Sequence, residues 1–269
     1  MGSAFAPQPG SRHVLGGISQ LGLAMSSPEV IQPYRPPPLQ VERANYAQPV
    51  RLHLPPKWKT SAVKRVDVIF ASDDSGSMYG PSGDPRGVRR AAALSVVQVM
   101  ASGSGGRVGV VHWGSSAPPE LVLPLTAVRR TKSVNAGLEI PPTLGGNNFP
   151  AALARAREVL EAGGGGADRI PLVLAITDGI EEVGVAAEAQ LRLLPPSCVH
   201  VLLVDHSHGC SSDLEAGWSA LPLGSFTRLD VLDTRRMAWQ AAEIVAQAVG
   251  VHMPPLLPVR KRPSLKTKR

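Results

Sequence analysis

The sequence predicts an α/β fold: a doubly wound, mostly parallel sheet with helices on both faces and one short antiparallel edge strand. From about Lys64 onward, short apolar runs alternate with amphipathic stretches, which is typical of strands joined by crossover helices. Most of these runs are apolar on both faces, as in buried parallel strands. Polar strings follow two of them, at the edge where open parallel sheets place their ligand sites.

Composition divides the chain into three parts. Ten of the 26 prolines lie in the first 60 residues, where the aliphatic runs are short, so residues 1–62 are expected to form a Pro-rich N-terminal arm, flexible or wrapped. Residues 63–250 are expected to form one domain, and residues 251–269 a basic C-terminal tail.

Six apolar runs are predicted to be strands. They are Val66–Asp73, Arg107–Gly114, Glu120–Leu125, Ile170–Thr177, Val199–Asp205 and Thr227–Asp233. Prolines at Pro118, Pro119 and Pro124 flank or interrupt the third run, and proline in a sheet is typical of an edge strand.

Six amphipathic stretches between the strands are predicted to be helices. They are Gly87–Met100, Ala127–Ala136, Phe149–Ala162, Val185–Leu194, Ser212–Leu221 and Thr234–Val249. Trp218 and Trp239 fall at apolar helical positions and are expected in the core, and Trp113 is expected in the core or at its rim.

The net charge of +7 belongs to the end of the chain. The last ten residues hold six of the 28 Lys and Arg and none of the 21 acidic residues, so residues 1–259 carry 22 basic and 21 acidic groups. Nucleic-acid binding is therefore not expected, except through the tail.

The two cysteines, Cys198 and Cys210, are too few for a disulfide framework, and no apolar run is long enough for a membrane span. We therefore expect a cytoplasmic protein. The abundance of Ala, Arg and Gly favours a bacterial source.

The most informative string follows the first strand. Alternate residues of an extended chain point the same way, so Asp73, Ser75 and Ser77 are expected to present one carboxylate and two hydroxyls to one point. Gly76 between the serines is expected to let the backbone turn. This string is half of a possible cation site.

The other half is expected from two neighbouring loops. Asp178 directly follows the apolar strand Ile170–Thr177, and Asn147 follows Gly145 and Gly146 just before a predicted helix. The combined set of carboxylates, hydroxyls and an amide offers only oxygen ligands, which Mg²⁺, Mn²⁺ or Ca²⁺ prefers. Few charges lie on the metal, so an outside carboxylate has room to complete its shell.

These residues, in this order and ending in Thr177-Asp178-Gly179, resemble the metal-ion-dependent adhesion site (MIDAS) of von Willebrand factor type A (vWA) domains. The resemblance spans roughly Lys64 to Val249. It implies a Rossmann-like fold in which the serines and the loop residue contact the metal, while the aspartates hold it directly or through water. Where the family usually has threonine, this chain has Asn147, and Asn148 is the alternative ligand.

Simpler interpretations stand beside the metal site. Asp74 or Ser77 could cap the next helix, and Met78 and Tyr79 could rim a docking surface or lie buried. His206, His208 and Cys210 form a loop that invites a zinc site, but the sequence offers no second cluster to complete four ligands.

The resemblance implies a protein-interaction module and not an enzyme. A partner would offer Asp or Glu to the metal, within a multi-protein assembly or with an AAA+ ATPase. Two alternatives stay open. One is a metal-dependent phosphohydrolase, although the strand ends offer few carboxylates and no base. The other is a metal-independent scaffold that uses the arm and the tail.

Overall fold

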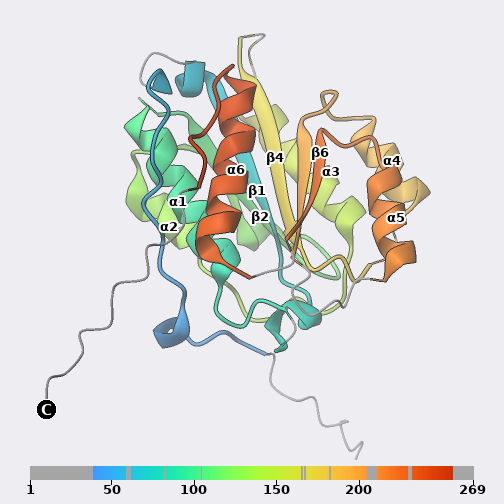
Figure 1. Cartoon of the computed structure of the whole chain (residues 1–269). Coiled ribbons are helices and arrows are strands. Elements are labelled where there is room, and N and C mark those ends of the chain that lie inside the picture. The colour runs from blue at the N-terminus through green and yellow to red at the C-terminus, as the bar shows by residue number, and fades with distance from the viewer. Residues whose placement is uncertain are drawn as a thin grey trace, which may run out of the picture. The chain divides into compact units, whose positions relative to one another are not determined.

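A six-stranded sheet organises the protein in this computed structural model (Figure 1). The structure describes residues 39–58, 62–81, 83–103, 105–164, 166, 168–181, 183–204, 211–229 and 232–256. The strand order is β3-β2-β1-β4-β5-β6, so the chain starts near the middle of the sheet and winds first to one edge and then to the other. The predicted α/β class is confirmed.

The strands are β1 (Val66–Asp73), β2 (Arg107–Trp113), β3 (Val122–Ala127), β4 (Ile170–Thr177), β5 (Val199–Val204) and β6 (Ser225–Leu229). All neighbours pair in parallel except β2 and β3, so β3 is the antiparallel edge strand that its prolines predict. The central strands β1 and β4 are buried along nearly their whole length, in agreement with their apolar sequences.

The helices are α1 (Val88–Ser102), α2 (Thr131–Gly137), α3 (Phe149–Ala162), α4 (Val185–Leu191), α5 (Ser212–Ala220) and α6 (Thr234–Ala248). Two apolar cores separate them. One core joins the sheet to α1, α2 and α6, and the other joins it to α3, α4 and α5. Figure 1 shows α1 and α6 side by side on the near face, with α3 behind the sheet.

Five predicted elements had boundaries that were wrong by two residues or more: β3, α2, β6, α4 and the end of α1. Residues 119–121 form a 3₁₀ turn, and β3 continues to Ala127 because that residue pairs with Arg107, so α2 begins only at Thr131. The last strand lies earlier than predicted, because Ser225 already pairs with His200. Helix α4 stops at Leu191, since Pro195 has no N–H to bond the Leu191 carbonyl four residues before it. The prediction of β5 extends to Asp205, which lies outside the described residues.

Both flanking segments pack on helices where the structure describes them. In the predicted arm, Trp58 donates its indole N–H to Val99 O at 2.7 Å, and the Val50 N–H bonds to Ser95 Oγ at 2.9 Å, so this part wraps along α1. At the start of the predicted tail, Pro254 O accepts a 2.7 Å hydrogen bond from Trp239. Trp239 is therefore half-buried under this segment, not in the core, whereas Trp113 and Trp218 are fully buried.

No helix among the described residues is long and apolar enough to cross a membrane.

The junction of β5 and β6 gives a pH-dependent prediction. Burial lowers the pKa of His200 to about 4, and its Nδ1 lies 2.8 Å from Ser225 Oγ. The unfolded chain protonates His200 near its ordinary pKa of about 6.5. Stability from the neutral ring is therefore complete above about pH 6.5 and is lost as the pH falls towards 4.

We expect urea unfolding to show that the wild type loses more stability between pH 7 and pH 5 than His200→Asn, whose amide keeps a hydrogen bond to Ser225 without titrating. Equal losses in the two proteins would argue against a buried neutral histidine.

Candidate metal centre

Five predicted ligands gather at the edge where the parallel strands end. β1 ends at Asp73 and the adjacent β4 ends at Thr177, so Asp73 and Asp178 come from neighbouring strand ends. Ser75 Oγ and Ser77 Oγ lie 3.1 Å apart, and Ser77 lies close enough to Asp178 to affect its pKa.

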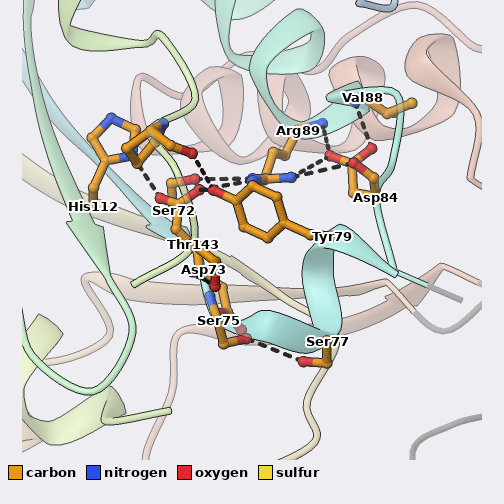
Figure 2. A network of polar contacts seen from close by, with 12 residues as sticks. Ser72, Asp73, Ser75, Ser77, Tyr79, Asp84, Val88, Arg89, His112 and Thr143 are labelled. Atoms are coloured by element: carbon orange, nitrogen blue, oxygen red, sulfur yellow. Dashed lines mark hydrogen bonds and ion pairs between the residues drawn. The ribbon is translucent and has the colours of Figure 1, made fainter. Parts of the chain in front are cut away.

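Asp73 is held by two hydrogen bonds. Its Oδ1 accepts from the Ser75 N–H at 2.9 Å, and its Oδ2 accepts from the Thr177 hydroxyl at 2.6 Å. Figure 2 shows Asp73 above Ser75 and Ser77 in the loop that follows β1. The sequence prediction includes Thr177 in the string Thr177-Asp178-Gly179 but gives it no role of its own. In the structure its hydroxyl orients Asp73.

The loop that carries Asn147 (the Gly-Gly loop, residues 144–147) is joined to the loop that follows β1 (the serine loop, residues 74–77) by backbone hydrogen bonds. The Gly76 N–H donates to Gly145 O at 2.8 Å, and the Leu144 N–H donates to Asp74 O at 2.8 Å. The backbone turns at Gly76, where the 3₁₀ turn Gly76–Tyr79 begins. The φ of Gly76 is not positive, and a Cβ there would meet only Gly145 O at 3.8 Å, so the turn does not require glycine.

Asn147 is fixed beside Asp178 through the next loop. Its Nδ2 donates to Ile180 O at 2.8 Å, while the Ile180 N–H donates to Asp178 Oδ1 at 3.2 Å. Asn147 Oδ1 and Asp178 Oδ2 are both buried without a hydrogen-bond partner in the described structure. Buried oxygens without a partner are costly, and a cation would satisfy both.

Asn148, the alternative ligand, has another role. Its Oδ1 caps α3 by accepting the Ala151 N–H at 3.0 Å, and its Nδ2 donates to Ser115 O at 3.1 Å. Asn147 is therefore the residue of this pair with an available oxygen.

The two carboxylates destabilise each other. The pKa of Asp73 is raised to about 7, mainly by burial and also by the nearby Asp178, while the hydrogen bonds from Thr177 and Ser75 oppose this rise. Burial also raises the pKa of Asp178, and the Ser77 hydroxyl and the Ile180 N–H oppose it. A bound dication would favour the ionised form of both groups.

The donor chemistry fits a hard cation. The centre offers two carboxylates, two hydroxyls and one amide oxygen, a set that suits Mg²⁺, Mn²⁺ or Ca²⁺ and not zinc. Within the described residues, no group of three or more His, Cys, Asp or Glu is placed to hold a metal ion. The histidine and cysteine loop of residues 205–210 lies outside those residues.

Next to the centre lies a buried charge cluster, formed by Asp74, Asp84, Arg89 and His112. Figure 2 shows Asp84, Arg89 and His112 near Asp73. Arg89 Nη2 is 2.7 Å from Asp74 Oδ1 and Arg89 Nη1 is 3.0 Å from Asp84 Oδ2. His112 Nδ1 lies 2.6 Å from Asp74 Oδ2, and its Nε2 lies 2.8 Å from Gly137 O. Through Asp74, the cluster connects the serine loop to Arg89 on α1 and to His112 on β2.

This cluster corrects the capping alternative. Asp84, and not Asp74 or Ser77, caps α1, since its two oxygens accept the N–H groups of Val88 and Arg89 at 2.7 and 2.9 Å. Burial raises the pKa of Asp74, but Arg89 and His112 lower it more, so the net pKa lies below the ordinary value.

Two neighbours of the serine loop are not free to rim a docking surface. Met78 is fully buried, and the Tyr79 hydroxyl donates to Pro141 O at 2.5 Å.

Glu181, which the sequence analysis missed, accepts the Phe149 N–H at 2.9 and 3.1 Å and so fixes the start of α3.

Residues 68–181 match the family model of the von Willebrand factor type A domain. The matched residues include β1 from Val68 onward, β2, β3, β4 and all five predicted ligands. No curated protein matches the sequence.

Several solved structures share the fold. The pilus adhesin SpaC from Lactobacillus rhamnosus GG is 17% identical, with a TM-score of 0.55 over 69% of this chain and 31% of that chain. Proximal thread matrix protein 1 from the mussel byssus is 19% identical, with a TM-score of 0.52 over 67% of this chain and 48% of that chain. The minor pilin PilB from Streptococcus sanguinis is 11% identical, with a TM-score of 0.50 over 68% and 61%.

This chain therefore spans less than two thirds of each of these three proteins. Fold and family match together define the class: an α/β, Rossmann-like protein whose residues 68–181 match the vWA domain family.

Proposed function

We propose that this protein is a divalent-cation-dependent protein-interaction module with a MIDAS. Asp73, Ser75, Ser77, Asn147 and Asp178 would hold Mg²⁺, or Mn²⁺ or Ca²⁺ in its place. The observation that carries the proposal is the pair of buried oxygens without partners, Asn147 Oδ1 and Asp178 Oδ2, in a site that also holds the Ser75 and Ser77 hydroxyls.

A bound cation would supply an electrophilic centre for an Asp or Glu carboxylate of a protein partner. The residues of this chain keep the ligands in place. Thr177 and the Ser75 N–H orient Asp73, and Ile180 orients both Asn147 and Asp178 through its backbone. Ligands held by such hydrogen bonds bind a metal with less loss of conformational freedom.

We propose binding and not catalysis. Among the described residues, His112 lies beside the serine loop, but both of its ring nitrogens are engaged, so it is not a base for Ser75 or Ser77. Two carboxylates are also fewer than two-metal hydrolysis requires. These features support the interaction module over the phosphohydrolase.

Fold relatives agree with this proposal. Two proteins of similar fold are a pilus adhesin and a minor pilin, so this architecture occurs in proteins named for adhesion and pilus structure. The AAA+ ATPase partner, the bacterial source and the cytoplasmic location stay predictions from the sequence.

The proposal that a protein partner binds through the metal is tested by affinity capture. Wild type and Asp178→Asn serve as baits in the native lysate, each in Mg²⁺ and in chelator. We expect a protein that wild type captures only in Mg²⁺ and that Asp178→Asn does not capture in either condition. Its site of contact is then tested by neutralising its Asp and Glu residues in turn. The same captured proteins in all four samples would contradict a metal-dependent partner.

A further inference from the structure

Basic side chains gather at the opposite edge of the sheet, where the parallel strands begin. Some of them lie just before β1 and β4, and one is the first residue of β2. Others follow β3, which ends at this edge because it is antiparallel and its last residue pairs with the first residue of β2. The members of this basic edge are Lys64, Arg65, Arg107, Arg129, Arg130, Lys132 and Arg169.

One buried carboxylate serves two of these cations. Asp67 accepts hydrogen bonds from Arg107 at 2.8 and 2.6 Å and from Arg169 at 2.6 and 2.5 Å. Burial raises the pKa of Asp67, but the two guanidinium groups lower it below its ordinary value. Two cations on one anion leave a net positive charge, so this edge is electropositive.

A cavity of about 290 Å³ opens at the basic edge. Its lining includes Lys64 and Arg129 and otherwise consists of small residues, namely Ala101, Gly105, Gly106, Ala127 and Val128. The lining contains no acidic residue. Neither Lys64 nor Arg129 makes an ion pair or a side-chain hydrogen bond with any part of the chain that the structure describes.

Glycine backbone forms part of the wall of this cavity. Met100 O accepts the N–H groups of Gly103 and Gly105, each at 3.0 Å, so this carbonyl at the end of α1 is already bonded. Gly106 has a φ of +138°, and a Cβ there would lie 2.9 Å from Val63 O, so the wall at this point is bare backbone.

We propose that this cavity binds a phosphate-bearing small anion, with Lys64 and Arg129 as its ligands. Lysine provides a compact charge with three donors, and arginine provides a planar fork that bonds two phosphate oxygens. Two cations in one cavity without a carboxylate favour a multiply charged group, such as a diphosphate or triphosphate, over a single carboxylate. The site lies at the strand-start edge, and it does not depend on the proposed metal centre.

The test is calorimetric titration of tripolyphosphate into the full-length protein at about 0.15 M salt, where exposed charges are largely screened. The test variant is Lys64→Gln/Arg129→Gln. The control is Arg130→Gln/Lys132→Gln, which removes the same charge from the same edge outside the cavity lining. Both keep the C-terminal residues with their six Lys and Arg, so binding there is common to the two proteins.

We expect saturable binding of tripolyphosphate to wild type. In the cavity variant the affinity is expected to weaken by about tenfold or more, because at least one charge-assisted hydrogen bond is lost. In the control variant it is expected to weaken by less than about threefold. Lys64→Arg is expected to retain binding. Equal weakening in both double variants would show general electrostatic attraction and overturn the proposal. Equally tight binding of a poly-glutamate peptide at the cavity would overturn the assignment to phosphate.

Discussion

Replacing Arg89 by methionine is expected to lower the free energy of unfolding by about 3–5 kcal/mol, because it leaves two buried carboxylates without their shared cation. Arg89 is 2% exposed, and Asp74 and Asp84 are fully buried. Methionine keeps an unbranched apolar side chain in the same space, so the loss arises mainly from charge. Urea unfolding, with the slope compared between variants, measures the change.

The neighbouring Arg90 gives a matched control. It lies on the same helix and pairs with Glu139 at 2.6 Å, but the two side chains are 15% and 32% exposed. Arg90→Met is therefore expected to cost about 1 kcal/mol or less. Small and equal losses for the two variants would show that the buried charge cluster does not stabilise the fold.

Arg89→Met is also expected to loosen the serine loop. Asp74 bonds Arg89 through its side chain, and its backbone carbonyl accepts the Leu144 N–H of the Gly-Gly loop. If Asp74 becomes mobile, both the serine loop and the Gly-Gly loop lose a fixed hydrogen-bond partner, so the proposed ligands on both loops are held less firmly.

The central strands and the site were predictable for one physical reason. Buried parallel strands need apolar side chains on both faces, and the runs that became β1 and β4 have them, so their bounds were predicted correctly. Once those strands lie side by side, Asp73 and Asp178 must come from the same edge. The clustering of the candidate ligands follows from the topology.

Edge strands were harder to predict, because burial no longer fixes their pattern. β6 is half-buried over most of its length, and hydrogen bonding to β5, not an apolar run, sets its start at Ser225. β3 was likewise placed too early, because pairing with Arg107 extends it to Ala127.

The buried charge cluster could not be predicted from spacing alone. Asp84 lies three residues before Gly87, the N-cap of α1, and bonds the Val88 N–H over a longer spacing than an N-cap side chain does. Arg89 is the one buried charged residue of α1. Their connection to Asp74 and His112 depends on β2 lying beside β1, which brings residues far apart in sequence into contact.

The second large effect is expected at the metal centre itself. Without a cation, the buried Asp73 and Asp178 repel each other, and each loses solvation. Asp178→Asn removes the like charge and nearly preserves the shape, so we expect it to raise the melting temperature in chelator. The same change removes a ligand, so we expect Mg²⁺ to stabilise wild type by mass action and to leave the variant unchanged.

Calorimetric titration of Mg²⁺ and Mn²⁺ into wild type, Asp178→Asn and Asp168→Asn tests the metal centre most directly. Asp168 is an exposed residue before β4, so the control carries the same charge change at the other edge of the sheet. We predict saturable binding to wild type and Asp168→Asn, with an affinity at least about 100-fold weaker in Asp178→Asn. No binding to wild type, or equal binding to all three proteins, would contradict the proposed centre.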